Sequence, residues 1–140
     1  MEKRIRYTLS KDGRLKSRKV IEHLFKEGKA FSIFPLRVIY MTTFPESLII
    51  DSKLQAGFSV STKNFKKAVD RNRIKRLMKE AYRLQKNPLV VQLENSDKKI
   101  AVFFIYTGND TPDYELIYEK MDSSIKRLQK IINENSVTNN

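Results

Sequence analysis

The spacing of apolar residues along the chain predicts three helices. Around residues 17–28, apolar side chains recur every three or four positions, as they do on one face of a helix, at Val20, Ile21, Leu24 and Phe25. Ser17 is suited to cap this helix and Gly28 to end it. Two longer amphipathic patterns predict helices over about 66–86 and from Thr111-Pro112 onwards, where proline suits the first helical position.

Other apolar runs predict strands between these helices. Segments 35–43 and 53–62 are predicted strands, and 47–51 is a candidate extension. The run 99–108 is almost continuously apolar, which is typical of a central strand buried on both faces. Residues 88–98 show neither period and are interpreted as a loop. The order of helix, two or three strands, helix, strand and helix predicts an α+β or α/β sandwich, in which helices pack on a sheet.

The chain has the length of one domain. Its 140 residues are enough to bury a core without disulfides. Residues 1–16 are basic and show little periodicity, so we expect a partly flexible N-terminal arm. A single domain is expected over 17–133, followed by a tail over 134–140.

Positive charge is concentrated in two stretches. The formal net charge is +12. Residues 63–86 hold ten Lys or Arg against two acids, and residues 1–19 hold eight against two. The remaining 97 residues are close to neutral. Such a local excess indicates nucleic acid, an anionic membrane surface or an acidic protein as the partner.

The composition excludes several kinds of site. The chain has no cysteine, so it has neither a disulfide framework nor a thiolate metal site. His23 is the single histidine, which excludes a cluster of histidine ligands. No apolar run approaches the roughly 20 residues of a membrane span, and the N-terminus lacks the apolar core of a signal peptide. We therefore expect a cytoplasmic protein without a membrane partner.

The predicted helix over 66–86 separates an apolar stripe from a cationic face. The stripe consists of Ile74, Leu77, Met78, Ala81 and Leu84. The opposite face and its flanks carry Arg71, Asn72, Arg73, Lys75, Arg76, Lys79 and Arg83, and only Glu80 interrupts them. A merely solvated face normally mixes charges, because like charges one turn apart repel each other. A polyphosphate partner would neutralise this face, so nucleic acid is favoured over simple solvation.

One stretch carries a resemblance to a known family. SVSTKNFKKAVDRNRIKRLMKEAYR, residues 59–83, resembles the signature of the bacterial ribonuclease P protein component. Its hallmark is an Arg-Asn-Arg helix after a strand and a lysine-rich turn, here Arg71-Asn72-Arg73. Outside this stretch the resemblance is looser but extends over about residues 14–130.

The resemblance implies both a fold and a function. The fold is an α+β sandwich of order α-β-β-β-α-β-α, with a left-handed βαβ crossover that general rules of chain connection would not predict. The implied partners are a catalytic RNA and precursor tRNA, from which the RNA removes the 5′ leader. The family's protein does not cut, so no catalytic or metal-binding side chain is expected, and Mg²⁺ belongs mainly to the RNA. We expect one copy of the protein in the holoenzyme.

The resemblance also assigns two sets of residues. The helix and the turn before it would contact the catalytic RNA through Lys63, Lys66, Lys67, Arg71, Asn72, Arg73, Lys75, Arg76, Lys79 and Arg83. A cleft between the first helix and the sheet would hold the leader through Ile21, Phe25, Arg37, Ile39, Ser59 and Ser61, with Gly57 in its floor. Family aromatics map to Ile21 and Phe25; Ile21 departs from the pattern, and Phe25 could equally belong to the core.

Two other functions compete with this one. A general RNA- or ribosome-binding module would need the same cationic face without an enzymatic context. A protein-only nuclease would need clustered carboxylates for Mg²⁺. Asp110, Asp113 and Glu115 are close in sequence, but they lie at the start of the predicted last helix, where capping explains them.

Overall fold

The computed structural model describes residues 13–48, 50 and 52–138 of the chain. This part contains four helices and four strands: α1 (Arg18–Glu27), β1 (Lys29–Ile33), β2 (Leu36–Met41), β3 (Leu54–Val60), α2 (Ala68–Gln85), α3 (Asn87–Glu94), β4 (Ile100–Tyr106) and α4 (Tyr114–Thr138). The predicted α+β class is confirmed, with a number of strands inside the predicted range and one more helix than the residue pattern indicated.

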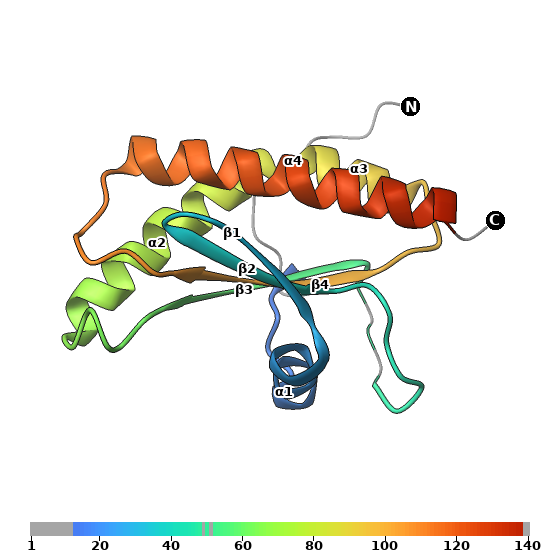
Figure 1. Ribbon diagram of the computed structural model, residues 1–140, viewed down its shortest axis with the longest axis horizontal. Coiled ribbons are helices and arrows are strands. Elements are labelled where there is room, and N and C mark those ends of the chain that lie inside the picture. Colours follow the sequence, from blue (N-terminus) through green and yellow to red (C-terminus); the bar gives the residue numbers. More distant parts are fainter. Residues whose placement is uncertain (1–12, 49, 51, 139–140) are drawn as a thin grey trace.

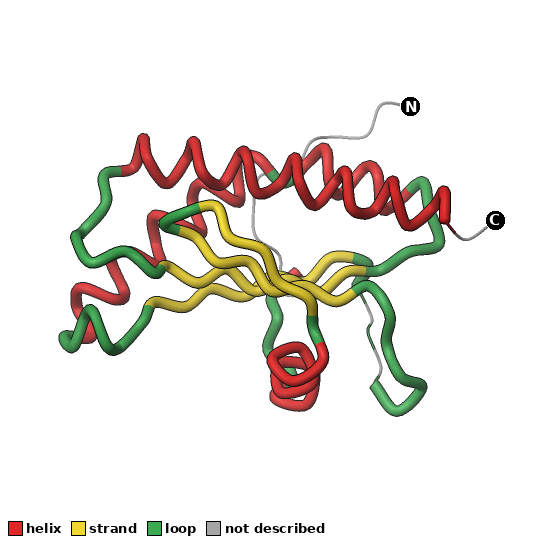
Figure 2. The backbone as a smooth tube through the Cα atoms, in the orientation of Figure 1, coloured by secondary structure: helices red, strands yellow, loops and turns green. Residues whose placement is uncertain are grey.

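The strands form one mixed sheet in the order β1-β2-β4-β3. The β1–β2 and β2–β4 pairs are antiparallel, whereas β3 and β4 are parallel. The parallel pair is connected through α2 and α3, as expected for a βαβ unit. Helices α2, α3 and α4 lie over one face of the sheet and α1 lies under the other (Figure 1). The sheet therefore separates two layers of helix, which Figure 2 shows edge-on.

The larger core lies between the sheet and helices α2, α3 and α4. Val102, Phe104 and Tyr106 of β4 contribute to it, together with Ile117, Met121 and Leu128 of α4. The predicted stripe of α2 needs correction: Ile74, Met78 and Ala81 are buried, but Leu77 is only partly buried and Leu84 is 38% exposed. Tyr82 is buried in their place, because its ring meets both Phe58 and Phe104, with centroids 5.5 and 5.6 Å away.

The smaller core lies between α1 and the opposite face of the sheet. Val20 and Leu24 of α1 pack with Ile39, Met41 and Ala101. The predicted helix boundaries hold, since Ser17 Oγ accepts a hydrogen bond from Val20 N at 3.4 Å and Gly28 is the C-cap. Strand β4 is not fully covered on this side: Phe103 and Ile105 are only partly buried, which corrects the expectation of burial on both faces.

Three local predictions were wrong. Residues 48 and 50 lie outside any strand, and the extra strand is instead β1, which forms a hairpin with β2. The predicted loop at 88–98 contains α3, because Pro88 is tolerated in a first helical turn and Leu89 and Leu93 are buried one turn apart. Helix α4 starts at Tyr114 rather than at Pro112, and Asp113 Oδ1 caps it by accepting from Leu116 N at 2.9 Å.

The two ends of the domain extend further than expected. Leu15 is buried and its N–H donates to Ala56 O at 3.0 Å, so residues 14 and 15 of the predicted arm lie against β3. Residues 1–12 of that arm are outside the described part of the chain. At the other end α4 continues to Thr138, so most of the predicted tail is helical.

Candidate nucleic-acid interface

Helix α2 buries one side and presents its basic residues on the other. Asn72, Arg73, Arg76 and Lys79 are exposed, and Lys75 is partly exposed. The residues of the turn before the helix, Lys63, Lys66 and Lys67, are exposed as well. Together with Arg71 and Arg83, these side chains make up the cationic surface. The structure therefore brings all ten predicted RNA-binding residues to one helix and the turn that leads into it; their contact with RNA stays a prediction.

Arg71 also has a structural role. Its Nη1 donates to the carbonyl oxygens of Phe65 and Lys66, at 2.9 and 2.7 Å. These bonds tie the turn to the first turn of α2. Arg71 is accordingly only partly exposed, in contrast to Arg73. The sequence placed both arginines in one motif, but their immediate surroundings differ.

Arg83 of the cationic surface forms an ion pair with Glu80. The Arg83 Nε donates to Glu80 Oε2 at 3.0 Å, and a second bond joins Nη2 to Oε1. The Arg83 hydrogen bond holds the pKa of the Glu80 carboxyl below its usual range, so Glu80 is ionised at neutral pH. Both side chains are solvent-accessible, so the pair fixes the geometry of Arg83 more than it stabilises the fold.

The turn between β3 and α2 is held from several sides. Asn64 Nδ2 donates to the carbonyl oxygens of Thr107 and Gly108, at 3.3 and 3.1 Å. Phe65 is buried, and its ring centroid lies 5.9 Å from that of Tyr106. The three exposed lysines of the turn therefore project from an anchored backbone. A fixed array of cations loses less conformational freedom on binding an anion than a mobile one.

The second candidate surface lies on the α1 side of the sheet. The strand register places Arg37, Ile105 and Ser59 in one row across β2, β4 and β3, and the next row contains Ile39, Phe103 and Gly57. Helix α1 covers Ile39, which is only 7% exposed, but leaves Phe103, Ile105, Arg37 and Ser59 accessible. These four residues are named the open sheet face below.

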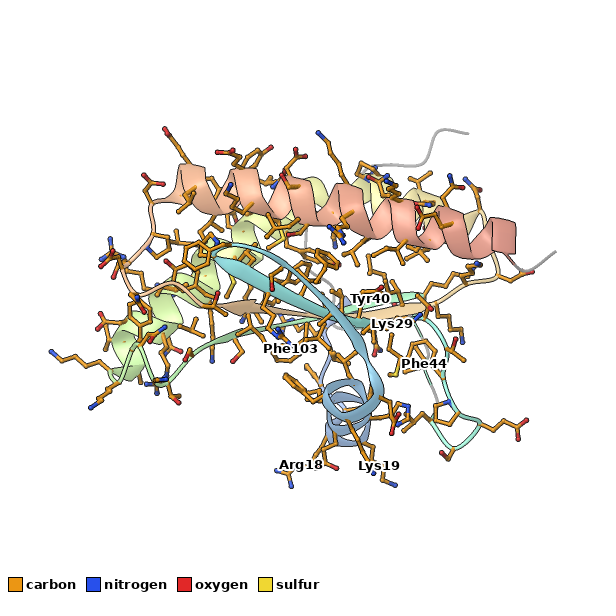
Figure 3. All side chains as sticks on the ribbon, in the orientation of Figure 1. Arg18, Lys19, Lys29, Tyr40, Phe44 and Phe103 are labelled. Carbon is orange, nitrogen blue, oxygen red and sulfur yellow. The ribbon has the colours of Figure 1, made fainter. Side chains whose placement is uncertain are left out.

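Phe25 joins α1 to this open sheet face. It is 49% exposed, and its ring meets Phe103 edge to face, with centroids 5.1 Å apart. The alternative of a core position is therefore wrong for Phe25. Figure 3 shows Phe103 on the α1 side of the sheet, while Arg18 and Lys19 of α1 point away from it. The two rings thus border the same part of the molecular surface.

Gly57 is required by the position of Phe103. A Cβ at this glycine would lie 2.5 and 2.7 Å from Cε2 and Cδ2 of the Phe103 ring. Such distances are far below van der Waals contact, so any side chain here would displace the ring. Of the small residues predicted for the floor of the cleft, Gly57, Ser59 and Ser61, the first thus has a specific reason, which is the space taken by an aromatic ring on the neighbouring strand.

Two predicted cleft residues lie differently from the rest. Ile39 packs in the smaller core under α1, and Ile21 is a partly buried neighbour of that core. Both residues belong to the packing of α1 against the sheet and not to the open sheet face. Ser61 lies just past β3, where its N–H donates to Tyr106 O at 3.3 Å. Phe103 and Ile105 were missed, although two consecutive phenylalanines in one strand must point to opposite faces.

The described residues offer no metal centre. Among them, no three His, Asp or Glu side chains are grouped closely enough to hold a metal ion. Asp113 is used to cap α4, and Asp110 accepts from Tyr106 Oη through its backbone oxygen at 2.6 Å.

No helix of the described chain is long and apolar enough to span a membrane.

Comparison with known proteins identifies the family. A family model described as Ribonuclease P matches residues 9–129. The ribonuclease P protein component of Porphyromonas gingivalis is 38% identical over 122 residues, which covers 87% of each chain. That of Chlorobium phaeobacteroides is 32% identical over 129 residues, covering 87% of this chain and 88% of the relative.

Solved structures share the fold at lower identity. RNase P protein from Thermotoga maritima superposes with a TM-score of 0.59 at 24% identity, covering 81% of this chain and 96% of the other. RNase P protein from Staphylococcus aureus gives a TM-score of 0.55 at 20% identity, covering 86% and 94%. The family model covers most of the chain and the relatives exceed 30% identity along most of their length. The chain therefore belongs to the ribonuclease P protein family.

Proposed function

We propose that this protein is the RNA-binding subunit of ribonuclease P. In this proposal the partner RNA removes the 5′ leader of precursor tRNA, and the protein binds both that RNA and the leader. The observation that carries the proposal is the cationic surface, which a chain of this family presents to solvent on α2 and the turn before it. A helix that keeps so many like charges together is best explained by a polyanionic partner.

The cationic surface would dock the catalytic RNA. Arg73 and Arg76 are exposed and can each donate two parallel hydrogen bonds to a phosphate. Asn72 is exposed between Arg71 and Arg73 and can bond a 2′-hydroxyl, a base edge or a phosphate oxygen. The N-cap residue of α2, Lys67, makes no capping hydrogen bond with its side chain, so the backbone N–H groups of the first turn add to the attraction for anions.

The open sheet face would receive the single-stranded leader. Single strands bind where aromatic rings stack on bases and cations follow the backbone. Phe25 and Phe103 supply adjacent rings, and Arg37 supplies a cation in the neighbouring row. This face and the cationic surface lie on opposite sides of the sheet, but Ser59 of the open sheet face is only four residues before Lys63 in the turn after β3. One RNA assembly could therefore engage both.

We assign the chemistry to the RNA. The described residues do not fit a metal-binding role, since they include no suitable cluster of carboxylates or histidine, and Mg²⁺ is therefore proposed to be held mainly by the RNA subunit. No protein side chain is assigned a catalytic role. We further propose that the protein acts in the cytoplasm, as one copy in the holoenzyme.

Reconstitution tests the proposed function. Purified protein alone is expected to leave precursor tRNA intact. Added to the ribonuclease P RNA of the same organism, it should lower the Mg²⁺ concentration needed for 5′ cleavage, as followed on a labelled precursor. Cleavage by RNA-free protein would contradict the assignment of the chemistry to the RNA. If the protein binds ribosomal RNA as tightly and does not stimulate cleavage, a general RNA-binding module is the better description.

Arg73 and Arg71 are expected to differ when each is changed to alanine. Arg73→Ala should weaken binding to the catalytic RNA by about 1 kcal/mol and lower the salt dependence, because one exposed cation no longer pairs with a phosphate. Its thermal stability should not change. Arg71→Ala should also lower the melting temperature, because it removes two hydrogen bonds to the turn. Filter binding over a salt series and thermal melts measure the two effects; equal melting temperatures would contradict the structural role of Arg71.

A further inference from the structure

An aromatic pair borders the cationic surface on the side of α4. Tyr114 and Tyr118 lie one turn apart at the start of α4, with ring centroids 5.9 Å apart and planes inclined by 53°. Tyr118 is 41% exposed, whereas Tyr114 is partly buried against the larger core. The exposed ring is thus backed by a second ring that is held in place by packing.

The pair is fixed relative to α2. Gln85 Nε2 donates to Ala81 O of its own helix at 3.1 Å and to Tyr118 O of α4 at 3.0 Å. This side chain therefore holds the backbone of Tyr118 at the C-terminal half of α2. The position of the Tyr118 ring does not depend on a loop, because Gln85 belongs to the long helix α2 and Tyr118 to the long helix α4.

On α2 the charged groups nearest to the pair are Glu80 and Arg83, while Glu115, Glu119 and Asp122 of α4 lie within about one turn of Tyr118. Burial, and then the Glu80 carboxylate, raise the pKa of Tyr114, while Arg83 lowers it, so this ring lies within electrostatic reach of the Glu80–Arg83 pair. Lys79 and Arg76 lie one and two turns before Arg83 on α2. An exposed aromatic ring on α4 thus lies beside the end of α2 that carries an arginine held in a fixed orientation.

We propose that Tyr118 stacks on an unpaired base of the RNA that docks on α2, while Arg83 and its neighbours contact the flanking phosphates. The inference rests on the proposed function and adds a contact from α4 to it. Aromatic rings beside cations are the usual means of holding unpaired nucleotides, because every base offers a flat apolar face. A ring already supported by Tyr114 and by the Gln85 bond loses little freedom on stacking.

A second copy of the chain fits this surface less well. The chain carries a net charge of +12, so two copies repel each other overall. The exposed apolar groups are also few, since Tyr118 and Leu84, exposed by 41% and 38%, are the main ones at this part of α2 and α4. A stable protein interface needs roughly 800 Å² from each partner, which two partly exposed side chains do not supply.

Two measurements test the stacking contact. The chain has no tryptophan, so Tyr118→Trp introduces a single tryptophan as a fluorescent reporter at this site. Saturation with the ribonuclease P RNA of the same organism should quench this tryptophan and protect it from acrylamide. In filter binding, Tyr118→Leu should weaken affinity about fivefold or more, while Tyr118→Phe, which keeps the ring, should bind as wild type does. Leu116→Ala is the control, because Leu116 is 36% exposed but lies on another side of α4.

The outcomes separate this inference from the proposed function. Normal RNA binding by the wild type and weakened binding by Arg73→Ala, with no quenching in Tyr118→Trp and a neutral Tyr118→Leu, would overturn the stacking contact alone. Loss of affinity in Tyr118→Phe equal to that in Tyr118→Leu would also overturn it, because the ring would then not be the group that matters. Failure of the wild type to bind the RNA would overturn both proposals. Thermal melts of each variant confirm that the compared proteins are folded.

Discussion

Replacing Met78 by alanine is expected to lower the free energy of unfolding by about 2–5 kcal/mol and to leave the RNA affinity of the folded protein unchanged. Met78 has no exposed surface and lies in the larger core with Ile74, Ala81 and Tyr82. Truncation removes buried methylene groups and the thioether, and it leaves a cavity between α2 and the sheet. The cationic surface on the opposite side of the helix keeps all its charges.

Urea denaturation followed by circular dichroism measures the loss of stability, and filter binding under native conditions measures the affinity. Leu84→Ala is the matched control on the same helix. Leu84 belongs to the predicted apolar stripe but is 38% exposed, so its truncation should cost less than about 1 kcal/mol. If Met78→Ala weakens RNA binding as strongly as Arg73→Ala does, the separation of a folding side and a binding side on α2 is wrong.

The cationic surface could be predicted from the sequence because it is a local property of one helix. Fixed angular steps of about 100° per residue place Arg76 and Lys79 opposite Ile74 without any knowledge of the rest of the fold. The edges of the buried stripe could not be placed in this way. Whether Leu84 or Tyr82 is buried depends on where the sheet and α4 cross α2, and the Tyr82 ring is held by Phe58 and Phe104 from two strands.

The open sheet face was harder to predict, because it depends on contacts between distant segments. Phe103 joins Gly57 and Ile39 only through the register of β4 with two other strands. The almost continuously apolar run of β4 concealed that alternate residues meet different layers. Strand β1 was missed for a related reason: it is a short edge strand, and five residues that pair only with β2 carry a weak local pattern.

Helix α3 shows the opposite difficulty. Its eight residues bury only Leu89 and Leu93, and Pro88 normally marks a break rather than a start. Packing on the larger core stabilises a helix that would be marginal in isolation. The bulk order of elements was therefore predictable, whereas short elements at the margins depended on tertiary contacts.

The leader contact should be the most informative of the binding effects, because it can be separated from RNA docking by the choice of substrate. Phe25→Ala should weaken the holoenzyme's binding of precursor tRNA by about 1–3 kcal/mol, the value of one stacked base, and leave mature tRNA unaffected. Phe25 is 49% exposed, so its truncation should not unfold the protein. Phe25→Leu is the control that keeps much of the apolar volume but lacks the flat ring.

Gly57→Ala tests the open sheet face through the residue that lies beside Phe103 on the neighbouring strand. The added methyl group would lie 2.5 Å from Phe103 Cε2, so the Phe103 ring must move from its place beside Phe25. The leader-dependent part of the affinity should fall although no aromatic ring has been removed.

Arg37→Ala should instead reduce the salt dependence of the leader-dependent part of the affinity. The slope of log affinity against log salt concentration should fall by about 0.7 for each single-strand phosphate that the arginine no longer neutralises.

The measurement compares precursor and mature tRNA on the reconstituted holoenzyme over one salt series, with thermal melts of each variant. Because both substrates share the tRNA body, any effect on docking of the protein to the catalytic RNA changes both affinities equally and cancels in their ratio. A change in the ratio therefore reports the leader alone. If Phe25→Ala and Gly57→Ala weaken both substrates to the same extent, the open sheet face does not bind the leader, and the leader must follow another path across the protein.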